Sequence, residues 1–438
     1  MTSIRKNLSW IIVLILAFIP AVIWLTMLPL TIRFGDLNNT LTSFGQLTGL
    51  VGMALFAISL ILSARLKFFD KHLRGLNRVY VNHHRYGAIA FILLLFHPLF
   101  LVGRYLLFSL ESAVVFLLPG SNWAINLGEL SLLGMIILLV LTFFVSLRYD
   151  FWKNTHKYLG LAFFLGGLHA FLITSDISRS TPLRWYVLTL SALGILIYIY
   201  NTLLGRVTVR RYLYNVDDVN KLNEAVVEIV MSPFKADEKI SYQAGQFAFV
   251  NFNDIRVGLE QHPYSFVSAP YEGQIKFAIK NLGDYTSTLS RLTKGAIAKV
   301  EGAYGQFSYA NIPNKKQIWI AGGIGITPFV SMGMEWAQRA DTPEYSIDLY
   351  YCAKDEAELV LMNRLNEISA AHPNFHVIPF CASIRGQINA KIIGDTSGGL
   401  IGKDILVCGP PGMMKSLKEQ FIHLGVKKQN IHSEEFKF

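Results

Sequence analysis

The chain has 438 residues, of which 52% are hydrophobic, 13% aromatic and only 16% charged, whereas about a quarter of the residues in an average globular chain are charged. The formal net charge is +10, but no basic tract with interleaved aromatic residues is present, so we expect no nucleic-acid partner. The three cysteines, Cys352, Cys381 and Cys408, lie in the second half without disulfide or zinc spacing, which is typical of a protein in a reducing compartment.

The apolar residues are concentrated in the first half of the chain. Residues 9–204 consist mostly of long apolar runs, whereas residues 205–438 have the composition of an ordinary soluble protein. The first run follows Arg5 and Lys6 and is too long for a cleaved signal peptide, so we expect a retained helix. Six segments approach the roughly 20 apolar residues that a bilayer-spanning helix needs. They are residues 9–30, 42–64, 83–106, 128–147, 156–175 and 184–204.

Basic residues are distributed unequally between the predicted connections. One side carries Arg5, Lys6, Arg65, Lys67, Lys71, Arg74, Arg78, Arg148, Lys153, Arg206, Arg210 and Arg211, and the other carries Arg33, Arg104, Arg179 and Arg184. Because cytoplasmic loops are enriched in Lys and Arg, we expect both termini and the soluble half on the cytoplasmic side of a cell membrane. The third and fifth predicted helices then both run outward.

Histidines are concentrated in these two helices. His83 and His97 belong to the third, and His156 and His169 to the fifth. Ionisable residues inside membrane spans are costly and therefore usually functional. The spacings of 14 and 13 residues correspond to about 21 and 20 Å along a helix. Two parallel helices thus offer two levels of paired imidazoles, and each pair suits a haem with one histidine on either side.

Two details of this assignment stay open on spacing alone. Thirteen residues leave His169 off the face of His156 on a regular helix, although three intervening glycines permit a twist or close packing. His84 is a rival to His83, which we prefer because it shares a face with His97. A membrane histidine can also serve as a hydrogen-bond partner or a proton relay.

The soluble half divides into two patterns. Strand-like runs such as Val207–Leu213 and Ala225–Met231 predict a small antiparallel β-barrel up to residue 312. From residue 313, apolar strands alternate with helices, which is typical of an α/β domain. The expected parallel strands are Lys316–Ala321, Ser346–Cys352 and Ile405–Val407, and the expected domains are residues 1–204, 205–312 and 313–438.

A glycine-rich turn is the strongest local signal. The run Ile318-Trp-Ile-Ala-Gly-Gly-Ile-Gly-Ile-Thr-Pro-Phe329 leads from a buried strand into three glycines, Gly322, Gly323 and Gly325. Thr327 is the expected helix N-cap and Pro328 the first helical residue. Glycines let the backbone approach a pyrophosphate, and free N–H groups at the helix N-terminus bind it. Glycines in such turns can also serve packing alone. The prediction of a dinucleotide site therefore depends on the strand, the glycines, the N-cap and the proline together.

Two segments of the predicted barrel are candidates for binding a flat ring and an anion. In His262-Pro-Tyr-Ser-Phe, an extended stretch would display Tyr264 for stacking, with Ser265 beside it. In Lys280-Asn-Leu-Gly-Asp-Tyr-Thr-Ser-Thr-Leu289, a turn at Gly283 precedes a hydroxyl-rich helix start, which is a possible anion site. The first segment is equally well explained as a strand that contains prolines. The second is equally well explained by ordinary helix capping.

Three features of the last domain are further candidates. Cys408 stands at the carboxyl end of a predicted strand, where ligands bind in such sheets, although a buried cysteine without chemistry fits equally well. The chain ends in Ser433-Glu-Glu-Phe-Lys-Phe438, whose aromatic residues would cover a flavin or close a core. Lys354 follows the second α/β strand, where it would meet a 2′-phosphate and favour NADPH over NADH, or else is a solvated lysine.

Together these motifs resemble those of the NADPH oxidase and ferric reductase superfamily, and the chain looks like a compact prokaryotic member over residues 10–438. The resemblance implies an α-helical six-span membrane bundle with two b-type haems, followed by a β-barrel FAD domain and an α/β nucleotide-binding domain. The family's paired histidines match His83 with His97 and His156 with His169, including the 13-residue spacing and Thr155 before His156. A small residue at Gly87 supports His83 rather than His84.

The resemblance also implies functional residues in the soluble half. The implied cofactor-binding residues are His262, Pro263, Tyr264 and Ser265 of the flavin motif; Gly283, Thr286 and Ser287 of the flavin phosphate turn; Gly322, Gly323, Gly325, Thr327, Pro328 and Lys354 for the nicotinamide nucleotide; Cys408, Gly409 and Pro410; and the terminal aromatic Phe436. Of these, Tyr264, Ser265, Cys408 and Phe436 are the expected catalytic residues.

The chain departs from the family's patterns at three points. No calcium-binding loop precedes the first predicted helix, so calcium control is not expected. Simpler soluble reductases use arginine where His262 stands. Animal oxidases have a further histidine four residues after the outer ligand of the third helix, where this chain has Leu101. This difference weakens the inference that this chain produces superoxide as they do.

The activity implied by the resemblance is that of an NAD(P)H-dependent oxidoreductase. Electrons would pass from cytoplasmic NADPH or NADH through FAD and two haems to an acceptor outside. Dioxygen, giving superoxide, is the favoured acceptor, and a chelated ferric or cupric ion is the alternative. The short outer connections near residues 31–41, 107–127 and 176–183 argue against an external redox protein, and no partner subunit is required. Arg33 and Arg104 would attract haem propionates or an anion at the outer face, or serve only as juxtamembrane charges.

Overall fold

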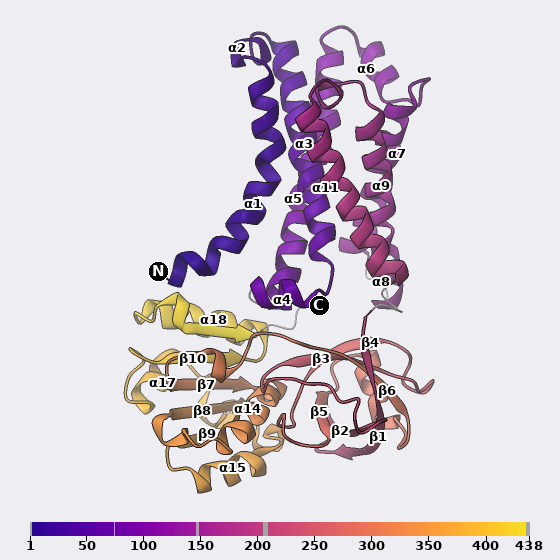
Figure 1. Cartoon of the computed structure of the whole chain (residues 1–438). Coiled ribbons are helices and arrows are strands. Elements are labelled where there is room, and N and C mark those ends of the chain that lie inside the picture. Colours follow the sequence, from indigo (N-terminus) through magenta and orange to yellow (C-terminus); the bar gives the residue numbers. More distant parts are fainter. Residues whose placement is uncertain (1, 74, 146–148, 205–208, 435–438) are drawn as a thin grey trace. The chain divides into compact units, whose positions relative to one another are not determined.

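The computed structural model describes residues 2–73, 75–145, 149–204 and 209–434. The chain divides into two compact units, Met1–Thr208 and Val209–Phe438. The first unit is built from helices, and the second from strands and helices (Figure 1).

The first unit contains long helices joined by short ones. Their bounds are α1 Thr2–Met27, α2 Leu30–Arg33, α3 Leu37–Leu62, α4 Lys67–His72, α5 Leu76–Leu106, α6 Leu110–Phe116, α7 Trp123–Phe143, α8 Tyr149–Lys157, α9 Leu159–Leu172, α10 Asp176–Arg179 and α11 Thr181–Ile199, which continues as a π-helical turn, Tyr200–Leu204. Several of these helices have a polar N-cap residue, whose side chain accepts a hydrogen bond from a free N–H of the first turn. Asp36 caps α3, Asn122 caps α7 and Ser180 caps α11.

Five helices in the described part of this unit are long and apolar enough to cross a membrane. They are Trp10–Met27 within α1, the helices α3, α5 and α7, and Thr181–Thr202. The predicted fifth span, residues 156–175, is instead divided between α8 and α9, and α9 has only 14 residues. The structure thus supports five of the six predicted spans among the described residues, and the fifth predicted span stays a prediction. The division falls at Tyr158, between His156 and His169, so these two histidines do not belong to one regular helix.

Several helices start earlier than the apolar runs predict. α3 begins at Leu37, α5 at Leu76 and α7 at Trp123, and the predicted connection 107–127 includes α6. Hydropathy marks only the apolar part of a helix, whereas the helix continues until a cap or a glycine ends it. Gly75, with φ +100°, precedes α5 in this way.

Small residues allow the long helices to approach one another closely. α3 packs along α5, α7 along α9, and α11 against both α3 and α9. A Cβ at Gly52 would lie 2.9 Å from Leu94, and one at Gly160 would lie 2.3 Å from the ring of Tyr198. Packing of this kind holds membrane helices together, because lipid tails supply no hydrophobic driving force between helices.

A buried ion pair joins α1, α2 and α10. The Nη1 atom of Arg33 lies 3.1 Å from Oδ2 of Asp176, and its Nη2 donates to the carbonyl of Trp24. The Trp24 indole donates to the same carboxylate at 2.9 Å, and the guanidinium lies 3.4 Å from the centre of its ring. Arg33, which we considered as an anion-attracting residue, is thus engaged by the protein. Arg104 donates through Nε to the side chain of Asn38.

The first sheet of the second unit is antiparallel. Its strands are β1 Arg211–Lys221, β2 Val226–Pro233, β3 Phe247–Phe252, β4 Gln261–Ser265, β5 Ile275–Lys280 and β6 Ile297–Tyr304, in the order β4-β3-β6-β1-β2-β5. The end strands β4 and β5 approach each other without forming a ladder. The predicted barrel is therefore a curled antiparallel sheet. Part of the predicted strand Val207–Leu213 lies outside the described residues, and β1 starts at Arg211.

The second sheet is parallel. Its strands are β7 Lys316–Gly322, β8 Ser346–Ala353, β9 Phe375–Cys381, β10 Asp404–Cys408 and β11 Ile431–Glu434, in the order β11-β10-β7-β8-β9. The three predicted parallel strands are confirmed as β7, β8 and β10. The edge strands β9 and β11 were not predicted; β9 contains Pro379, and β11 has only four residues.

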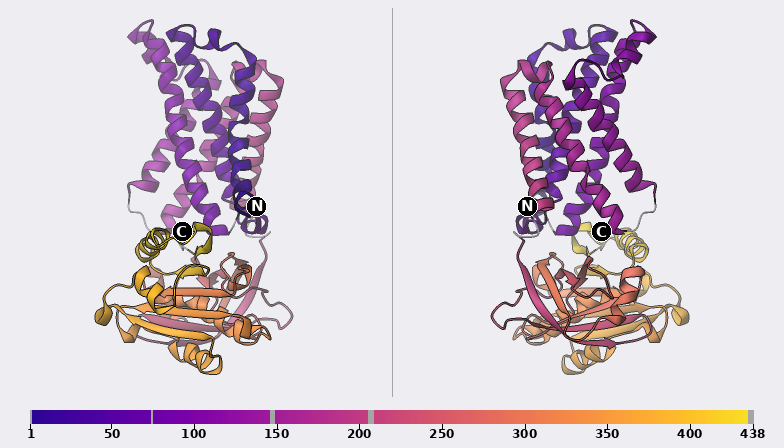
Figure 2. Two further views of the ribbon diagram at one scale, coloured as in Figure 1. Left: turned by 90° about the vertical axis from the view of Figure 1, so that its left-hand side faces the viewer. Right: turned by 90° about the vertical axis from the view of Figure 1, so that its right-hand side faces the viewer.

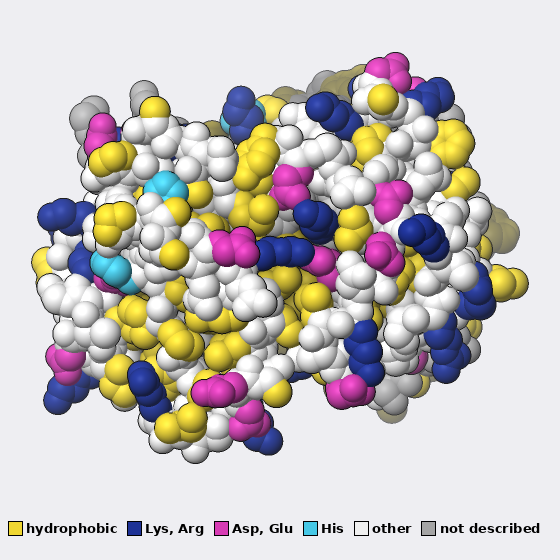
Figure 3. Space-filling view, turned by 90° about the horizontal axis from the view of Figure 1, so that it is seen from below, with side chains coloured by type: hydrophobic (Ala, Val, Ile, Leu, Met, Phe, Trp, Pro, Cys, Tyr) yellow, Lys and Arg dark blue, Asp and Glu magenta, His cyan; other side chains and the backbone are white. Residues whose placement is uncertain are grey.

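The residues of β7 alternate between two cores, one on each face of the parallel sheet. Ile318 and Ile320 pack with α17 (Ala390–Thr396) and α18 (Pro411–His423). Trp319 and Ala321 pack with α14 (Thr327–Ala337) and α15 (Met362–Ala371). Figure 2 shows these helices on the two faces of the sheet. The second core also includes residues of the antiparallel sheet, so the two sheets share it. The surface in Figure 3 carries charges of both signs among apolar side chains.

The buried ion pair generates a stability prediction. Replacing Asp176 with Ala leaves Arg33 charged and buried, which lowers the free energy of unfolding by about 3–5 kcal/mol. Thermal unfolding of the detergent-solubilised protein measures this effect. Arg179→Gln is the control, because the Arg179 side chain is 72% exposed and 3.8 Å from the same carboxylate, and exposed pairs contribute about 0–1 kcal/mol. Equal melting temperatures for the two variants would contradict the prediction.

Candidate functional site

The four membrane histidines come together as two facing pairs. The ring centres of His83 and His156 are 6.1 Å apart at an interplanar angle of 76°, and those of His97 and His169 are 6.3 Å apart at 68°. Two metal–imidazole bonds of roughly 2 Å plus the half-widths of two rings separate the ring centres by about 6 Å. Each pair therefore has the spacing of two imidazoles on opposite sides of one metal ion, as in a bis-histidine haem.

Both outer rings are held by the same arrangement on a neighbouring helix. In each case Nδ1–H donates to a backbone carbonyl, and a glycine four residues later leaves room for the ring. The groups are Gly45 O at 2.7 Å and Gly49 for His97, and Ala124 O at 2.6 Å and Gly128 for His169. A Cβ at either glycine would lie 2.8 Å from Nδ1 of the ring. Since a carbonyl only accepts, Nδ1 carries the proton and Nε2 keeps its lone pair for a metal.

The inner pair is anchored on one side only. Nδ1 of His83 lies 2.8 Å from the carbonyl of Ser59 and 3.0 Å from its hydroxyl. Nδ1 of His156 is buried, and the described residues give it no hydrogen-bond partner. Its ring stacks on Trp152 at 5.4 Å. His84 packs its ring against Phe143 at 5.5 Å, which supports His83 as the residue that faces His156.

The glycine-rich turn differs from the prediction at the helix start. A 3₁₀ turn, Gly323–Ile326, is inserted between β7 and α14, so Ile326 is the N-cap and Thr327 the first helical residue. Thr327 as N-cap was therefore wrong, and its hydroxyl donates to the carbonyl of Ile324 at 3.1 Å. No side chain caps α14. The Thr327 N–H donates to the carbonyl of Ile324 and Pro328 has no N–H, so an anion at this helix start would depend on the N–H groups beyond Pro328.

The three glycines of this turn have different roles. Gly323 has φ +53° and open space where a Cβ would be, so the backbone turn requires it. A Cβ at Gly325 would lie 2.4 Å from the carbonyl of Cys408, and one at Gly322 would lie 2.7 Å from Pro410. Close packing brings the glycine-rich turn and the Cys408–Pro410 segment together. Two of the glycines serve packing, which was the alternative explanation.

Cys408 is buried at the end of β10. Its side chain is almost inaccessible, and its backbone pairs with Ala321 and Glu434 on the two neighbouring strands. Burial raises the pKa of the Cys408 thiol well above its usual range, and the Glu434 carboxylate raises it further. The thiol is therefore protonated at neutral pH. Phe436, the expected aromatic cover, lies outside the described residues.

The predicted flavin segment forms the edge strand β4 of the curled sheet. The hydroxyl of Tyr264 is buried and has no hydrogen-bond partner among the described residues, and burial raises the pKa of this hydroxyl well above its usual value. Ser265 is buried next to it. The ring of His262 stacks on Tyr285 at 4.2 Å, and its Nε2 lies 2.8 Å from the Glu260 carboxylate.

In the predicted phosphate turn, the hydroxyls of Thr286 and Ser287 form hydrogen bonds with the backbone of the turn itself. Gly283 precedes α13 (Asp284–Thr288), and Thr286 Oγ1 accepts hydrogen bonds from the N–H groups of Leu282 and Gly283 at 2.9 and 3.0 Å. Ser287 donates to a carbonyl of the same turn. Helix capping accounts for the Thr286 hydroxyl, as the alternative interpretation proposed, and a hydrogen bond within the short helix accounts for that of Ser287. Lys354 is exposed directly after β8.

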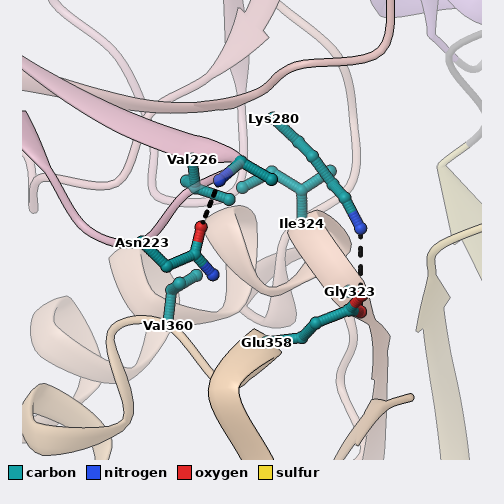
Figure 4. Close-up of a pocket in the computed structure, with 8 residues that line it drawn as sticks. Asn223, Val226, Lys280, Gly323, Ile324, Glu358 and Val360 are labelled. Atoms are coloured by element: carbon teal, nitrogen blue, oxygen red, sulfur yellow. Dashed lines mark hydrogen bonds and ion pairs between the residues drawn. The ribbon is translucent and has the colours of Figure 1, made fainter. Parts of the chain in front are cut away.

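A pocket lies beside the glycine-rich turn, between the two sheets (Figure 4). Its lining residues are Asn223, Ala225, Val226, Lys280, Gly323, Ile324, Glu358 and Val360. Lys280, at the end of β5, points toward Glu358, which follows β8, and the charged atoms are 3.6 Å apart. Sequence patterns did not identify this ion pair, because Lys280 ends a strand of the first sheet, Glu358 lies in a 3₁₀ turn 78 residues later, and neither stands out locally.

Three family models match successive parts of the chain. They are the ferric reductase like transmembrane component over residues 48–167, the FAD-binding domain over residues 212–322 and the oxidoreductase NAD-binding domain over residues 319–419. The transmembrane match includes three of the paired histidines and ends just before the fourth, His169.

Individual relatives match the soluble half. The toluate 1,2-dioxygenase electron transfer component of Pseudomonas putida is 26% identical over 231 residues, which are 50% of this chain and 66% of that protein. A flavohemoprotein of Rhizobium meliloti (strain 1021) is 25% identical over 248 residues, which are 52% of this chain and 60% of that protein. The matches thus span less than two thirds of the length of either relative.

A flavohemoglobin from Malassezia yamatoensis, solved with FAD and heme, has 17% identity and a TM-score of 0.53, covering 91% of this chain and 98% of that one. At this identity the likeness concerns the fold alone. The three family matches, in this order, place a ferric-reductase-like transmembrane domain, an FAD-binding domain and an NAD-binding domain in one chain, which is the architecture of the NAD(P)H oxidoreductases of the ferric reductase and NADPH oxidase superfamily.

Proposed function

We propose that this chain is a multi-pass protein of a cell membrane that transfers electrons from NADPH or NADH, by way of FAD and two b-type haems, to a small acceptor on the outer side. The observation that carries the proposal is the pair of histidine levels, with ring centres 6.1 and 6.3 Å apart. When bound, FAD accepts a hydride from the nicotinamide and releases single electrons, which haem iron carries reversibly. The excess of basic residues in one set of connections supports cytoplasmic termini.

The histidine environment fits haem binding. The four rings would supply the axial nitrogens, and three of them are held by Nδ1–H hydrogen bonds that leave Nε2 as the donor. His156 relies on stacking with Trp152. With an imidazole on each side of the metal, such a site would leave no place for the acceptor on the metal. We therefore propose outer-sphere reduction of the acceptor.

The curled sheet fits a flavin. The buried hydroxyl of Tyr264 lacks one hydrogen-bond partner, which a bound group beside β4 would supply. We propose that β4 and the turn at Gly283 hold FAD. The proposed residues are His262, Pro263, Tyr264, Ser265, Gly283, Thr286, Ser287 and, at the end of the chain, Phe436.

The carboxyl edge of the parallel sheet fits the nicotinamide nucleotide. The uncapped start of α14 would bind the pyrophosphate, and the pocket beside Gly323 contains Lys280, whose ammonium group is 3.6 Å from Glu358. We propose that Lys280 exchanges Glu358 for a nucleotide phosphate. Cys408, Gly409 and Pro410 would form the adjoining wall, and Lys354 would favour NADPH through its 2′-phosphate.

Dioxygen is the acceptor we propose first, with superoxide as the product. A ferric or cupric chelate is the second candidate, and the match of residues 48–167 to a ferric reductase like component favours it. An external redox protein is the third. We propose that no partner subunit is required.

The acceptor is tested with the purified full-length chain loaded with FAD and haem. Addition of NADPH should consume oxygen and generate superoxide, and His169→Ala should lose one haem and stop this transfer while the flavin is still reduced. Rapid reduction of a ferric chelate without oxygen consumption would show that the protein is a metal reductase and not an oxidase. A reduced-minus-oxidised spectrum without haem bands would refute the haem assignment.

The glycine at each outer ring generates a second prediction. Gly128→Ala places a Cβ 2.8 Å from the His169 ring, which displaces the ring and removes or weakens one of the two haems. Gly134→Ala on the same helix is the control, because its nearest contact would be an ordinary 3.9 Å from Ala162. The haem-to-protein ratio measures the effect. A full haem content in Gly128→Ala would contradict the role of this glycine.

A third prediction concerns Lys280. Lys280→Met should raise the KM for NADPH about 10-fold or more with a much smaller change in kcat, as expected for the loss of one charged hydrogen bond. Glu358→Gln should lower the KM, because it frees Lys280. Steady-state kinetics with an artificial acceptor measures both. Lys276→Met is the control, since Lys276 pairs with Glu272 at 2.6 Å on the same strand. An unchanged KM in Lys280→Met would exclude Lys280 from the nucleotide site.

A further inference from the structure

The curled sheet and the α/β domain share one apolar core, to which β2 and β5 contribute Val226 and Ala278. The residues Val227 and Ile229 of β2 point the other way, into the separate core of the curled sheet. Because side chains alternate along a strand, Glu228 points with Val226 toward the α/β domain. Apolar burial holds these two parts together but is not directional, so their orientation depends on the polar contacts between them.

A bidentate ion pair supplies one directional contact at this face. Arg364, in α15, donates through Nη1 and Nη2 to Oε1 and Oε2 of Glu228, at 2.7 and 3.0 Å. The Glu228 side chain is 4% exposed and that of Arg364 is 28% exposed. The fork of a guanidinium fits a carboxylate in one plane, which adds geometric specificity to the attraction of the charges. The pair therefore fixes one point of α15 against β2.

A buried hydrogen bond supplies a second directional contact. The hydroxyl of Ser331 donates to the carbonyl of Ser268 at 2.6 Å, and both residues are fully buried. Ser268 follows the end of β4, the proposed flavin strand, by three residues, and Ser331 belongs to α14, which starts after the glycine-rich turn. A single contact permits rotation about it, whereas two separate contacts restrict that rotation. Together they hold the glycine-rich turn and β4 in one relative orientation.

The ion pair lies on the two strands that line the pocket. Val226, two residues before Glu228, is part of the pocket wall. Glu228 pairs across the sheet with Ala278, and Lys280, two residues further along β5, is part of the same wall. The opposite wall belongs to the α/β domain. A shift at the ion pair would therefore move the two walls relative to each other.

We propose that Arg364 is a positioning residue, which through Glu228 fixes the α/β domain against the curled sheet in the orientation that hydride transfer requires. The inference rests on the proposed function. In that step the nicotinamide is oxidised and the flavin is reduced, because the hydride passes from one ring to the other with both electrons of its C–H bond. A misplacement of about 1 Å can slow a reaction about 100-fold. The rate therefore depends on how the domains that hold the two rings are oriented.

Anaerobic stopped-flow reduction of the flavin in the full-length, FAD-loaded protein tests this, together with thermal unfolding. Arg364→Lys keeps the charge but loses the planar fork. It should lower the rate of flavin reduction at least about 10-fold. The rate is measured at saturating NADPH, where weaker nucleotide binding has no effect on it.

The double variant Glu228→Met with Arg364→Met separates orientation from stability. Replacing a buried ion pair with apolar residues of similar volume is often neutral or stabilising, so this variant should keep the native melting temperature. Its flavin should still be reduced at least about 10-fold more slowly. Arg339→Lys is the matched control, because Arg339 forms a bidentate pair with Asp341 at 2.7 and 3.0 Å inside the α/β domain. It should leave the rate unchanged.

A native rate in Arg364→Lys or in the double variant would overturn the proposal, and so would an equal loss of rate in Arg339→Lys. A loss of rate that accompanies a lower melting temperature in every variant would assign the ion pair to stability and overturn the proposal as well. A native protein that binds NADPH and FAD without reducing the flavin would instead refute the proposed function, so the two failures are distinguishable.

Discussion

The membrane half depends on hydrogen bonds between imidazole Nδ1–H groups and main-chain carbonyls of adjacent helices. A helix carbonyl already accepts an N–H from its own helix, and it becomes accessible to a neighbour only where no side chain covers it. Gly49 and Gly128 provide that opening one turn beyond Gly45 and Ala124. In an apolar environment an unpaired imidazole N–H is costly, so these bonds stabilise the rings and determine which nitrogen is left for a ligand.

The soluble half uses glycine for a related purpose. Gly322 and Gly325 let β7 and the following turn approach the segment after β10, and no side chain caps the start of α14. The groups that the proposed site would offer to an anion are thus main-chain N–H groups. In both proposed sites the backbone would supply contacts, and glycine gives access to it. Local hydrophobic patterns carry little information on such contacts.

The elements that the sequence predicts well are those whose hydrophobic pattern follows from burial. Of the six spans predicted from apolar runs, five are long apolar helices in the described residues, and apolar strands predicted β7, β8 and β10, because burial determines both patterns. The break at Tyr158 was missed, since hydropathy is insensitive to a local turn between apolar segments. Thr327 was misplaced by one position because a 3₁₀ turn precedes the helix. The Lys280–Glu358 pair joins the end of β5 to a 3₁₀ turn after β8, and only the fold brings its members together.

The two histidine levels differ in how their rings are anchored. At the outer level both rings donate to carbonyls, which makes each imidazole a stronger electron donor and favours an oxidised metal. At the inner level His156 has no such bond within the described residues, and its ring stacks on Trp152. Under the proposed haem assignment, this difference in anchoring would lower the reduction potential at the outer level relative to the inner one.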